Sequence, residues 1–233
     1  MAMFPVMKSR PAARGGARCG RPPRELAGEV DERILEAARK VFLDRGFEGA
    51  SVEEIAEAAR SGKPTIYARY PNKQALFAAA YTSALAARTA RLASYTPAGT
   101  TIEERLTSLG EALLREVLTS EWIGLIRLAI AEARRFPDLG SSVLKITRER
   151  GIETMGRLLG EAVHAEGPGK LPEFNSDHCA AGARYFVDLI LLPVVMRALS
   201  GEDLKALHTE IGGPYISQRV AFFLAAWRHG GLG

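Results

Sequence analysis

The sequence predicts an all-α protein, and three observations lead to this fold class. Apolar residues recur at intervals of three and four along most of the chain, and beyond residue 75 no alternation typical of strands appears. Capping residues before helix starts, and Pro or Gly after helix ends, divide this pattern into separate helices. Between residues 51 and 73 two short helices are expected on either side of a tight turn, which is the layout of a helix-turn-helix.

The composition is that of an ordinary globular protein, with 233 residues of which 47% are hydrophobic and 25% are charged. The longest apolar run, 189–196, has eight residues and is too short to span a membrane, so no membrane partner is expected. Cys19 and Cys179 are far apart and have no neighbours at metal-binding spacing, which fits a reducing compartment. Because no export signal develops near the first residues, we expect a cytoplasmic protein.

Residues 1–30 are predicted to form a disordered basic arm. They carry six Lys or Arg against two Glu, and Pro, Gly, Ala and Arg dominate the segment. Arg21 and Arg24 lie in a Gly-Arg-Pro-Pro-Arg sequence that is similar to the core of a minor-groove AT-hook, so both are candidate DNA contacts. The alternative is a solubilising tail that contacts nothing.

Residues 31–75 are predicted to form the DNA-binding domain. Its first helix is expected at 31–45 and should stop at Gly46, which is a favourable residue just past a helix end. Ser51 is expected to cap the second helix, and Glu54, three places on, would complete a capping box.

The turn of this motif is expected at 60–62, with Gly62 supplying backbone freedom for a sharp corner. A second short helix follows at 63–70, and Asn72 should cap the helix after it. In a helix-turn-helix the second helix enters the major groove of DNA. No Asp or Glu occurs between Ala58 and Ile102, although several Arg and Lys do, and this excess of positive charge favours an anionic partner.

The segment from residue 34 to residue 77 resembles the DNA-binding domain of the TetR/AcrR family of bacterial transcriptional regulators. The residues that match the family pattern in order and spacing are Phe42, Gly46, Phe47, Ser51, Ile55, Ala56, Lys63, Thr65, Ile66, Tyr67, Tyr70, Lys73, Leu76 and Phe77. The turn departs from that pattern, because Arg60 stands at a usual glycine position, where positive φ is expected, and Gly62 replaces a capping serine.

Four residues are candidates for contacts with DNA phosphates. Ser51, at a helix N-terminus, can offer its hydroxyl to a phosphate. Lys63, Tyr67 and Lys73 are the expected backbone anchors, as the resemblance also implies. A solvated Lys63 and a core position for Tyr67 are the alternatives.

Two residues are candidates for contacts with base edges. Arg69 can donate two hydrogen bonds to guanine, and Thr65 lies four residues before it on the same short helix. The alternatives are a solvated Arg69 and a Thr65 that only caps. Pro64, also counted in the DNA-binding segment, suits the first turn of a helix because its missing N–H has no intrahelical acceptor there. Tyr70 is expected to be buried.

Residues 76–233 are predicted to form an all-α effector-binding and dimerisation domain. Helices are expected at 73–95, 101–118, 121–135, 138–165, 175–199 and 216–229, with a short piece near 202–210. Residues 167–172 are predicted to be a loop. Thr101 with Glu104, and separately Ser120, are the expected helix caps in this part of the chain.

The resemblance implies a homodimer that binds a palindromic DNA operator, since paired recognition helices must meet two half-sites. The apolar residues of the last two long helices are the expected dimer interface, namely Leu189, Leu192, Met196, Val220, Phe223 and Trp227. The alternative is that these side chains fill the core of one subunit.

The family's helical domain also encloses a small-molecule cavity, so a small-molecule effector is expected. The large side chains on the central helices are the candidates for its wall, namely Trp122, Ile126, Met155, Leu159, Tyr185 and Phe186, although such residues are more often core. They favour an apolar or aromatic ligand. Arg88, Arg134 and His164 are polar candidates for orienting it.

No enzyme is expected, because the four histidines are scattered and no zinc, Walker, GxSxG or GxGxxG pattern is present. No cofactor is expected either. The sequence as a whole favours a homodimeric transcriptional repressor whose operator affinity is lowered by a ligand in the C-terminal domain. The alternative is a DNA-binding regulator or architectural protein without a small-molecule effector.

Overall fold

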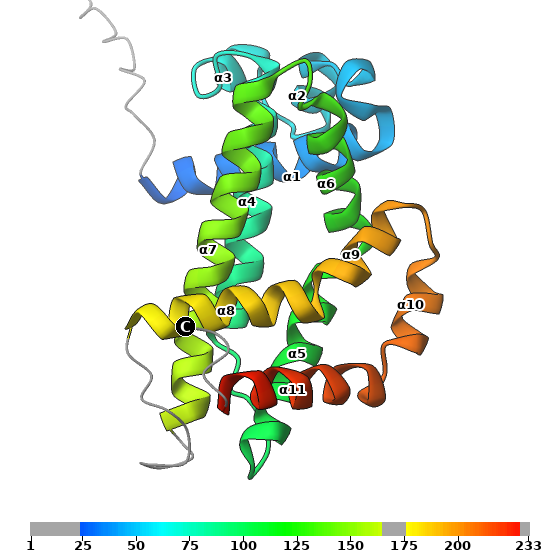
Figure 1. Ribbon diagram of the computed structural model, residues 1–233. Helices are drawn as coiled ribbons and strands as arrows, with labels where there is room; N and C mark the ends of the chain where they lie inside the picture. The colour runs from blue at the N-terminus through cyan, green and yellow to red at the C-terminus, as the bar shows by residue number, and fades with distance from the viewer. Residues whose placement is uncertain (1–23, 165–175, 229–233) are drawn as a thin grey trace, which may run out of the picture.

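The computed structural model describes residues 24–164 and 176–228, and within these ranges it contains helices and turns but no strands. The prediction of an all-α fold is confirmed. The short α2 and α3 lie at one end of the molecule, the long α4 and α7 run away from them, and α8 and α11 cross the other half (Figure 1). The helices are α1 Arg24–Gly49, α2 Val52–Ala58, α3 Lys63–Tyr67, α4 Lys73–Ala93, α5 Ile102–Val117, α6 Ser120–Glu132, α7 Pro137–His164, α8 Ser176–Ile190, α9 Leu192–Leu199, α10 Leu204–Glu210 and α11 Gly213–Arg228.

The buried side chains form two apolar cores. The first joins α1, α2, α3, the N-terminal half of α4 and α6, and the second joins α5, the later half of α7 and α8 to α11. Helix α4 belongs to both, because Leu76 lies in the first core and Leu92 in the second. The first core therefore continues past residue 75, and α4 connects the helix-turn-helix with the helical domain.

A series of aromatic rings runs through the first core. Phe47 stacks on Phe42 at 5.7 Å between ring centroids, and Phe42 meets Phe77 edge-on at 5.2 Å. Phe77 lies 6.4 Å from Tyr81, which in turn lies 4.8 Å from Trp122 on α6. Such ring pairs add to the stability gained by burial. The series gives a packed connection between the helix-turn-helix and the middle of the molecule.

Several helix ends differ from the sequence-based expectation. The first helix begins at Arg24, seven residues before the expected start, so the arm of residues 1–30 is helical in its last part. Residues 1–23, including Arg21, and the loop expected at 167–172 lie outside the described residues. Gly46 interrupts α1 with φ of 71°, which confirms the expected stop, although a last turn continues to Gly49. Thr119, and not Ser120, caps α6.

The single helix expected at 175–199 is divided into α8 and α9 at Leu191. Pro193 is the reason, because a proline has no N–H for the helix ladder and its ring clashes with the preceding turn. Two helices of different direction therefore stand where one was expected (Figure 1).

Thr101 and Glu104 form the capping box expected at the start of α5. The Thr101 hydroxyl accepts a hydrogen bond from the Glu104 N–H at 3.2 Å, and the Glu104 carboxylate accepts from the N–H groups of Thr100 and Thr101. These hydrogen bonds, that of Thr100 first, lower the pKa of Glu104. Because the pKa of Glu104 is lower in the folded protein than in the unfolded chain, the carboxylate adds to the free energy of unfolding above the unfolded pKa. This contribution is lost as pH falls through the folded pKa.

We expect Thr101→Ala to lower the free energy of unfolding by about 1 kcal/mol, since it removes a helix cap. Chemical denaturation at neutral pH measures this loss. Thr107→Ala, also on α5, is the matched control, because its hydroxyl donates to the Glu103 carbonyl inside the helix and caps nothing. Equal losses in both variants would show that the cap has no special contribution.

Candidate DNA-binding surface and ligand cavity

Ser51 caps α2 as expected, but the second half of its capping box does not form. The Ser51 hydroxyl accepts a hydrogen bond from the Glu54 N–H at 3.1 Å. The Glu54 carboxylate instead accepts from Arg45 Nε, also at 3.1 Å, and so ties α2 to α1. Ser51 is exposed at the start of α2, and its contact with phosphate stays a prediction.

Arg60 has φ of 49°, as its place at a usual glycine position predicts, and it is the only non-glycine residue with positive φ in the part of the chain that the structure describes. Around it α2 ends in a Schellman motif, because the Arg60 N–H donates to the Glu57 carbonyl and the Ser61 N–H to the Ala56 carbonyl. Gly62 follows as an N-cap without a side-chain hydrogen bond, and Pro64 occupies the first turn of α3. The turn keeps a regular geometry at the cost of strain at Arg60.

We expect Arg60→Gly to raise the free energy of unfolding by about 0.5–1 kcal/mol. The left-handed conformation costs a side-chain-bearing residue about 1–2 kcal/mol, and the added chain entropy of glycine offsets part of that gain. Thermal or chemical unfolding measures the change. Arg60→Ala, which keeps the strain and loses the guanidinium, is the control. If Arg60→Gly unfolds no later than Arg60→Ala, the turn is not strained.

Helix α3 presents the expected residues on its outer side. Lys63, Pro64 and Tyr67 are exposed, whereas Ile66 is buried against the first core and Thr65 is half-buried. Lys63 pairs with Glu53 of α2, and its ammonium lies 5.8 Å from the centroid of the Tyr67 ring. The aromatic and cationic groups suit a phosphate backbone, although Lys63 must share its charge with Glu53.

Arg69, the candidate for a base contact, forms an ion pair within the domain, and its contact with a base stays a prediction. Its Nε lies 2.6 Å from Oδ1 of Asp31 on α1, and its Nη1 donates to the Thr65 carbonyl at 3.2 Å. Tyr70 lies half-buried beside this pair, where burial first and the Asp31 carboxylate second raise the pKa of its phenol. A base contact by Arg69 therefore requires Asp31 either to orient the guanidinium or to release it.

Lys73 connects the start of α4 with the end of α1. Its ammonium donates to the carbonyls of Glu48 and Ala50, at 3.2 and 3.1 Å, and lies 4.8 Å from the centroid of the Phe47 ring. Asn72 caps α4 as expected, since its side chain accepts from the Ala75 N–H at 2.8 Å. Lys73 thus has a structural contact that the sequence did not predict, and its role as a phosphate anchor stays a prediction.

The stretch without acidic residues between Ala58 and Ile102 does not form a free basic surface. Carboxylates from other helices pair with four of its cations, in the pairs Lys63–Glu53, Arg69–Asp31, Arg88–Glu121 and Arg91–Glu116. The charge of a sequence segment does not reveal which carboxylates from other segments will lie beside it in the folded protein. The excess of positive charge on this stretch is therefore smaller in the folded protein than in the sequence, and its contact with an anionic partner stays a prediction. Arg24 opens α1, and its side chain lies outside the described residues.

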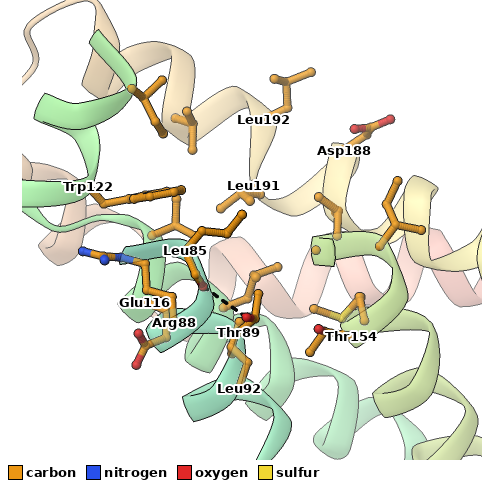
Figure 2. A pocket seen from close by; sticks show the side chains of 18 of the residues that line it. Leu85, Arg88, Thr89, Leu92, Glu116, Trp122, Thr154, Asp188, Leu191 and Leu192 are labelled. Carbon is orange, nitrogen blue, oxygen red and sulfur yellow. Dashed lines mark hydrogen bonds between the residues drawn. The ribbon is translucent and has the colours of Figure 1, made fainter. Parts of the chain in front are cut away.

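A cavity of about 540 Å³ lies among helices α4 to α9. Three of the expected wall residues line it, Trp122, Ile126 and Met155. The others do not, because Leu159 and Phe186 are fully buried in the second core and Tyr185, 48% exposed, lies on the outer side of α8. The sequence missed most of the wall, which is Leu85, Thr89, Leu92, Val117, Ile130, Ile152, Thr154, Val187, Asp188, Leu191 and Val195 among others (Figure 2).

Most of the wall is apolar, and three of its polar residues, Thr89, Glu116 and Arg88, have contacts within the protein. The Thr89 hydroxyl donates to the Leu85 and Ala86 carbonyls (Figure 2), and Glu116 is held by Arg91 in three short contacts of 2.6–3.0 Å. Arg88 is buried, with its guanidinium under the indole of Trp122 at 4.8 Å from Cζ to the ring centroid. Neither Arg134 nor His164, the other expected polar candidates, is part of this wall.

The expected dimer residues of α11 belong to the core of the subunit. Val220, Phe223 and Trp227 are buried in the second core, and the Trp227 ring lies so close to Gly182 of α8 that a Cβ there would stand 1.9 Å from Cζ3. Their burial within one subunit favours the alternative of a core role for all three.

The exposed apolar residue on α11 is instead Phe222, with 68% of its surface open. On the preceding helices Leu189 is half-buried against the second core. Leu192 and Met196 are exposed, but both line the cavity. Phe222 is a large apolar residue that lies outside the apolar stripe of this helix. That position was the signal in the sequence for an exposed apolar side chain.

In the residues that the structure describes, no helix is long and apolar enough to cross a membrane. The same part of the chain holds no group of three or more His, Cys, Asp or Glu that could bind a metal ion.

Family models match both parts of the chain. Residues 34–80 match the model of bacterial regulatory proteins of the tetR family, and residues 104–229, more than half of the chain, match that of the AefR-like transcriptional repressor C-terminal domain. The chain belongs to the TetR family of transcriptional regulators. This family consists of DNA-binding regulators and not of enzymes, and the helix-turn-helix at residues 51–73 lies within the segment that matches its N-terminal model.

Individual relatives agree with this assignment. A segment of 106 residues is 28% identical to an uncharacterized HTH-type transcriptional regulator of Mycobacterium tuberculosis, and covers 46% of this chain and 49% of that protein. A segment of 72 residues is 39% identical to the HTH-type transcriptional activator FasR of Mycolicibacterium smegmatis, and covers 31% of each. The chain thus spans about half the length of the curated relatives it matches, or less. A TetR-family regulator of Mesorhizobium loti has the same fold, with a TM-score of 0.72 and 24% identity over 86% of this chain and 97% of that one.

Proposed function

We propose that this TetR-family protein is a homodimeric repressor whose operator affinity falls when a small, mainly apolar molecule occupies the cavity. The observation that carries the proposal is the course of α4. Its first turn, with Leu76 and Phe77, packs in the core of the helix-turn-helix, and its later turns, with Leu85, Arg88 and Leu92, line the cavity. A ligand that pushes on the later turns acts on the same rigid element that positions α3. The match to the C-terminal domain of an AefR-like transcriptional repressor supports repression, and not activation, as the result of operator binding.

The mechanism follows from the geometry that DNA imposes. Two recognition helices of a dimer must meet half-sites roughly 34–36 Å apart, so a small rotation of each DNA-binding domain lowers operator affinity. Lys73 transmits movement of α4, because its ammonium holds the carbonyls of Glu48 and Ala50 at the edge of the helix-turn-helix. A ligand has this effect only if it binds better to the conformation that does not fit DNA.

Two exposed aromatic residues support a dimer built on α8 and α11. Tyr185 on α8 and Phe222 on α11 are 48% and 68% exposed, on helices that pack against each other. Large exposed apolar groups often mark a surface for another chain. We therefore assign the expected self-association to these outer sides of α8 and α11 and not to Val220, Phe223 or Trp227.

The alternative is a DNA-binding regulator with no effector, or one that activates transcription. The relative FasR is named as an activator, although its matching segment covers only 31% of this chain. Both alternatives keep the role of α3 and differ in how operator binding affects transcription.

Nuclease footprinting on the DNA upstream of the gene tests the proposal. We expect two protected half-sites related by a dyad, about one helical turn apart. A thermal-shift screen with small apolar compounds, followed by footprinting with any compound that binds, separates the repressor from the effector-free regulator. If no upstream DNA is protected, the proposed operator binding is wrong. If upstream DNA is protected but no bound compound changes the protection, the proposed response to a ligand is wrong.

A further inference from the structure

Arg88 is a buried cation in the cavity wall with unused hydrogen-bonding capacity. Only 7% of its surface is exposed, and its Nη1 donates to the Ala84 carbonyl at 3.1 Å. Its Nη2 donates to Thr119 Oγ1 at 3.2 Å and to Glu121 Oε2 at 3.1 Å. Among the described residues no group accepts the hydrogen of Nε, although this atom is buried. A buried donor without a partner is costly, and it favours a ligand that supplies an acceptor.

The charges around Arg88 do not balance. Glu121, its one carboxylate partner, also accepts from Nε of Arg39 on α1 at 3.1 Å, so two guanidinium groups share one carboxylate. The other carboxylate nearby in the wall, Glu116, is held by Arg91. Three guanidinium groups, of Arg39, Arg88 and Arg91, thus face two carboxylates, and the burial of Arg88 strengthens its attraction for an added anion.

The rest of the wall defines the other part of the ligand. Beyond Arg88 the cavity is lined mainly by aliphatic and aromatic side chains, including Leu85, Leu92 and Leu191 (Figure 2). Arg184 and Asp188 also belong to the wall, but both lie on the more exposed side of α8. A molecule that matches this arrangement has an apolar body and one anionic hydrogen-bond acceptor at its end.

We propose that the effector is an amphipathic carboxylic acid whose carboxylate binds Arg88, and that this contact weakens the Arg88–Glu121 pair and so reaches α1 through Arg39. The inference rests on the proposed function and deepens it by assigning the chemical class of the ligand. Because Glu121 bridges α4 to α1 through its two oxygens, a ligand carboxylate that draws Arg88 away changes how α6 holds the DNA-binding domain. Arg88 is then a specificity-determining residue, and Glu121 a positioning residue.

Calorimetric titration of the whole 233-residue chain tests the ligand class with two probes of equal chain length, decanoate and decylamine, each kept below its micelle concentration. We expect decanoate to bind the wild type and Arg88→Met to weaken this binding about ten- to a hundred-fold, as for loss of a hydrogen bond to a charged group. Arg88→Lys keeps the charge and should bind better than Arg88→Met. Arg157→Met is the matched control, since Arg157 pairs with Glu161 and lines no part of this cavity.

Equal decanoate affinity in the wild type and Arg88→Met would overturn the role of Arg88. Decylamine binding as tight as that of decanoate, or no binding of decanoate to the wild type, would overturn the carboxylic-acid class. None of these results affects operator binding by the ligand-free protein, so the proposed function is judged separately by the footprint.

The connection through Glu121 has its own readout. With decanoate at saturation we expect the operator affinity of the wild type to fall, and this fall to be several-fold smaller in Glu121→Gln, whose uncharged amide has one acceptor oxygen and cannot accept from both guanidinium groups. Decanoate affinity is measured in the same variant, so that a smaller fall is not caused by weaker loading. The same fold-change in Glu121→Gln and wild type would show that the signal does not pass through this carboxylate.

Discussion

Trp227→Ala is expected to lower the free energy of unfolding by about 3–5 kcal/mol, the usual cost of removing a large aromatic side chain from a core. Trp227 is only 7% exposed, its ring lies on Gly182 of α8, and its centroid is 5.4 Å from that of Phe223. No smaller side chain fills the space between α8 and α11. Chemical denaturation measures the loss, at two protein concentrations because dimer stability depends on concentration.

Phe222→Ala, earlier on α11, is the matched control for this prediction. Its side chain is 68% exposed and outside both cores, so we expect little change in the stability of the subunit and a weaker dimer in sedimentation equilibrium. The opposite pattern, a stable but monomeric Trp227→Ala and an unchanged dimer in Phe222→Ala, would restore Trp227 to the interface.

Arg69→Ala is expected to reduce operator affinity by about 1–3 kcal/mol, with relaxed specificity at one base pair, if its guanidinium reaches a base edge. Asp31→Asn should cost less, because the amide still accepts a hydrogen bond from Arg69 Nε but attracts the guanidinium less. Competition titrations with operators changed at single base pairs measure both effects. The ion pair with Asp31 makes this test necessary, since it holds Arg69 inside the domain.

A different result for Arg69→Ala would identify the other role of the residue. Equal losses on all operator sequences in Arg69→Ala and Asp31→Asn, together with lower thermal stability, would show that the pair only fastens α3 to α1. Base reading would then have to come from Thr65 and its exposed neighbours on α3.

Local chemistry made much of the DNA-binding domain predictable from the sequence. Ser51 and Asn72 cap their helices through their own side chains, and Gly46 interrupts a helix because its backbone can adopt positive φ. Even the strain at Arg60 followed from its position in a familiar turn. Each of these features is decided by residues within four places of each other.

Features that depend on distant residues were harder to predict. Two contacts join residues that are far apart in the sequence: Arg69 pairs with Asp31, 38 places away, and Lys73 donates to the Glu48 carbonyl, 25 places away. A short sequence motif does not contain both partners of either contact. The apolar stripe on α11 suits a core and an interface equally well, because both bury the same side chains. The cavity is a space among six helices, and helical periodicity cannot tell its wall from the core beside it. Pro193 alone was a local signal that should have divided the helix expected at 175–199.

The most direct test of specific operator binding is a fluorescence anisotropy titration of the wild-type protein with DNA from upstream of its own gene. A scrambled duplex of the same length and composition is titrated at the same salt concentration, because both affinities depend strongly on salt. We predict that the upstream DNA binds at least about a thousand-fold more tightly than the scrambled duplex, as specific sites do. Equal affinity for the two duplexes would contradict the assignment of α3 as a sequence-reading helix.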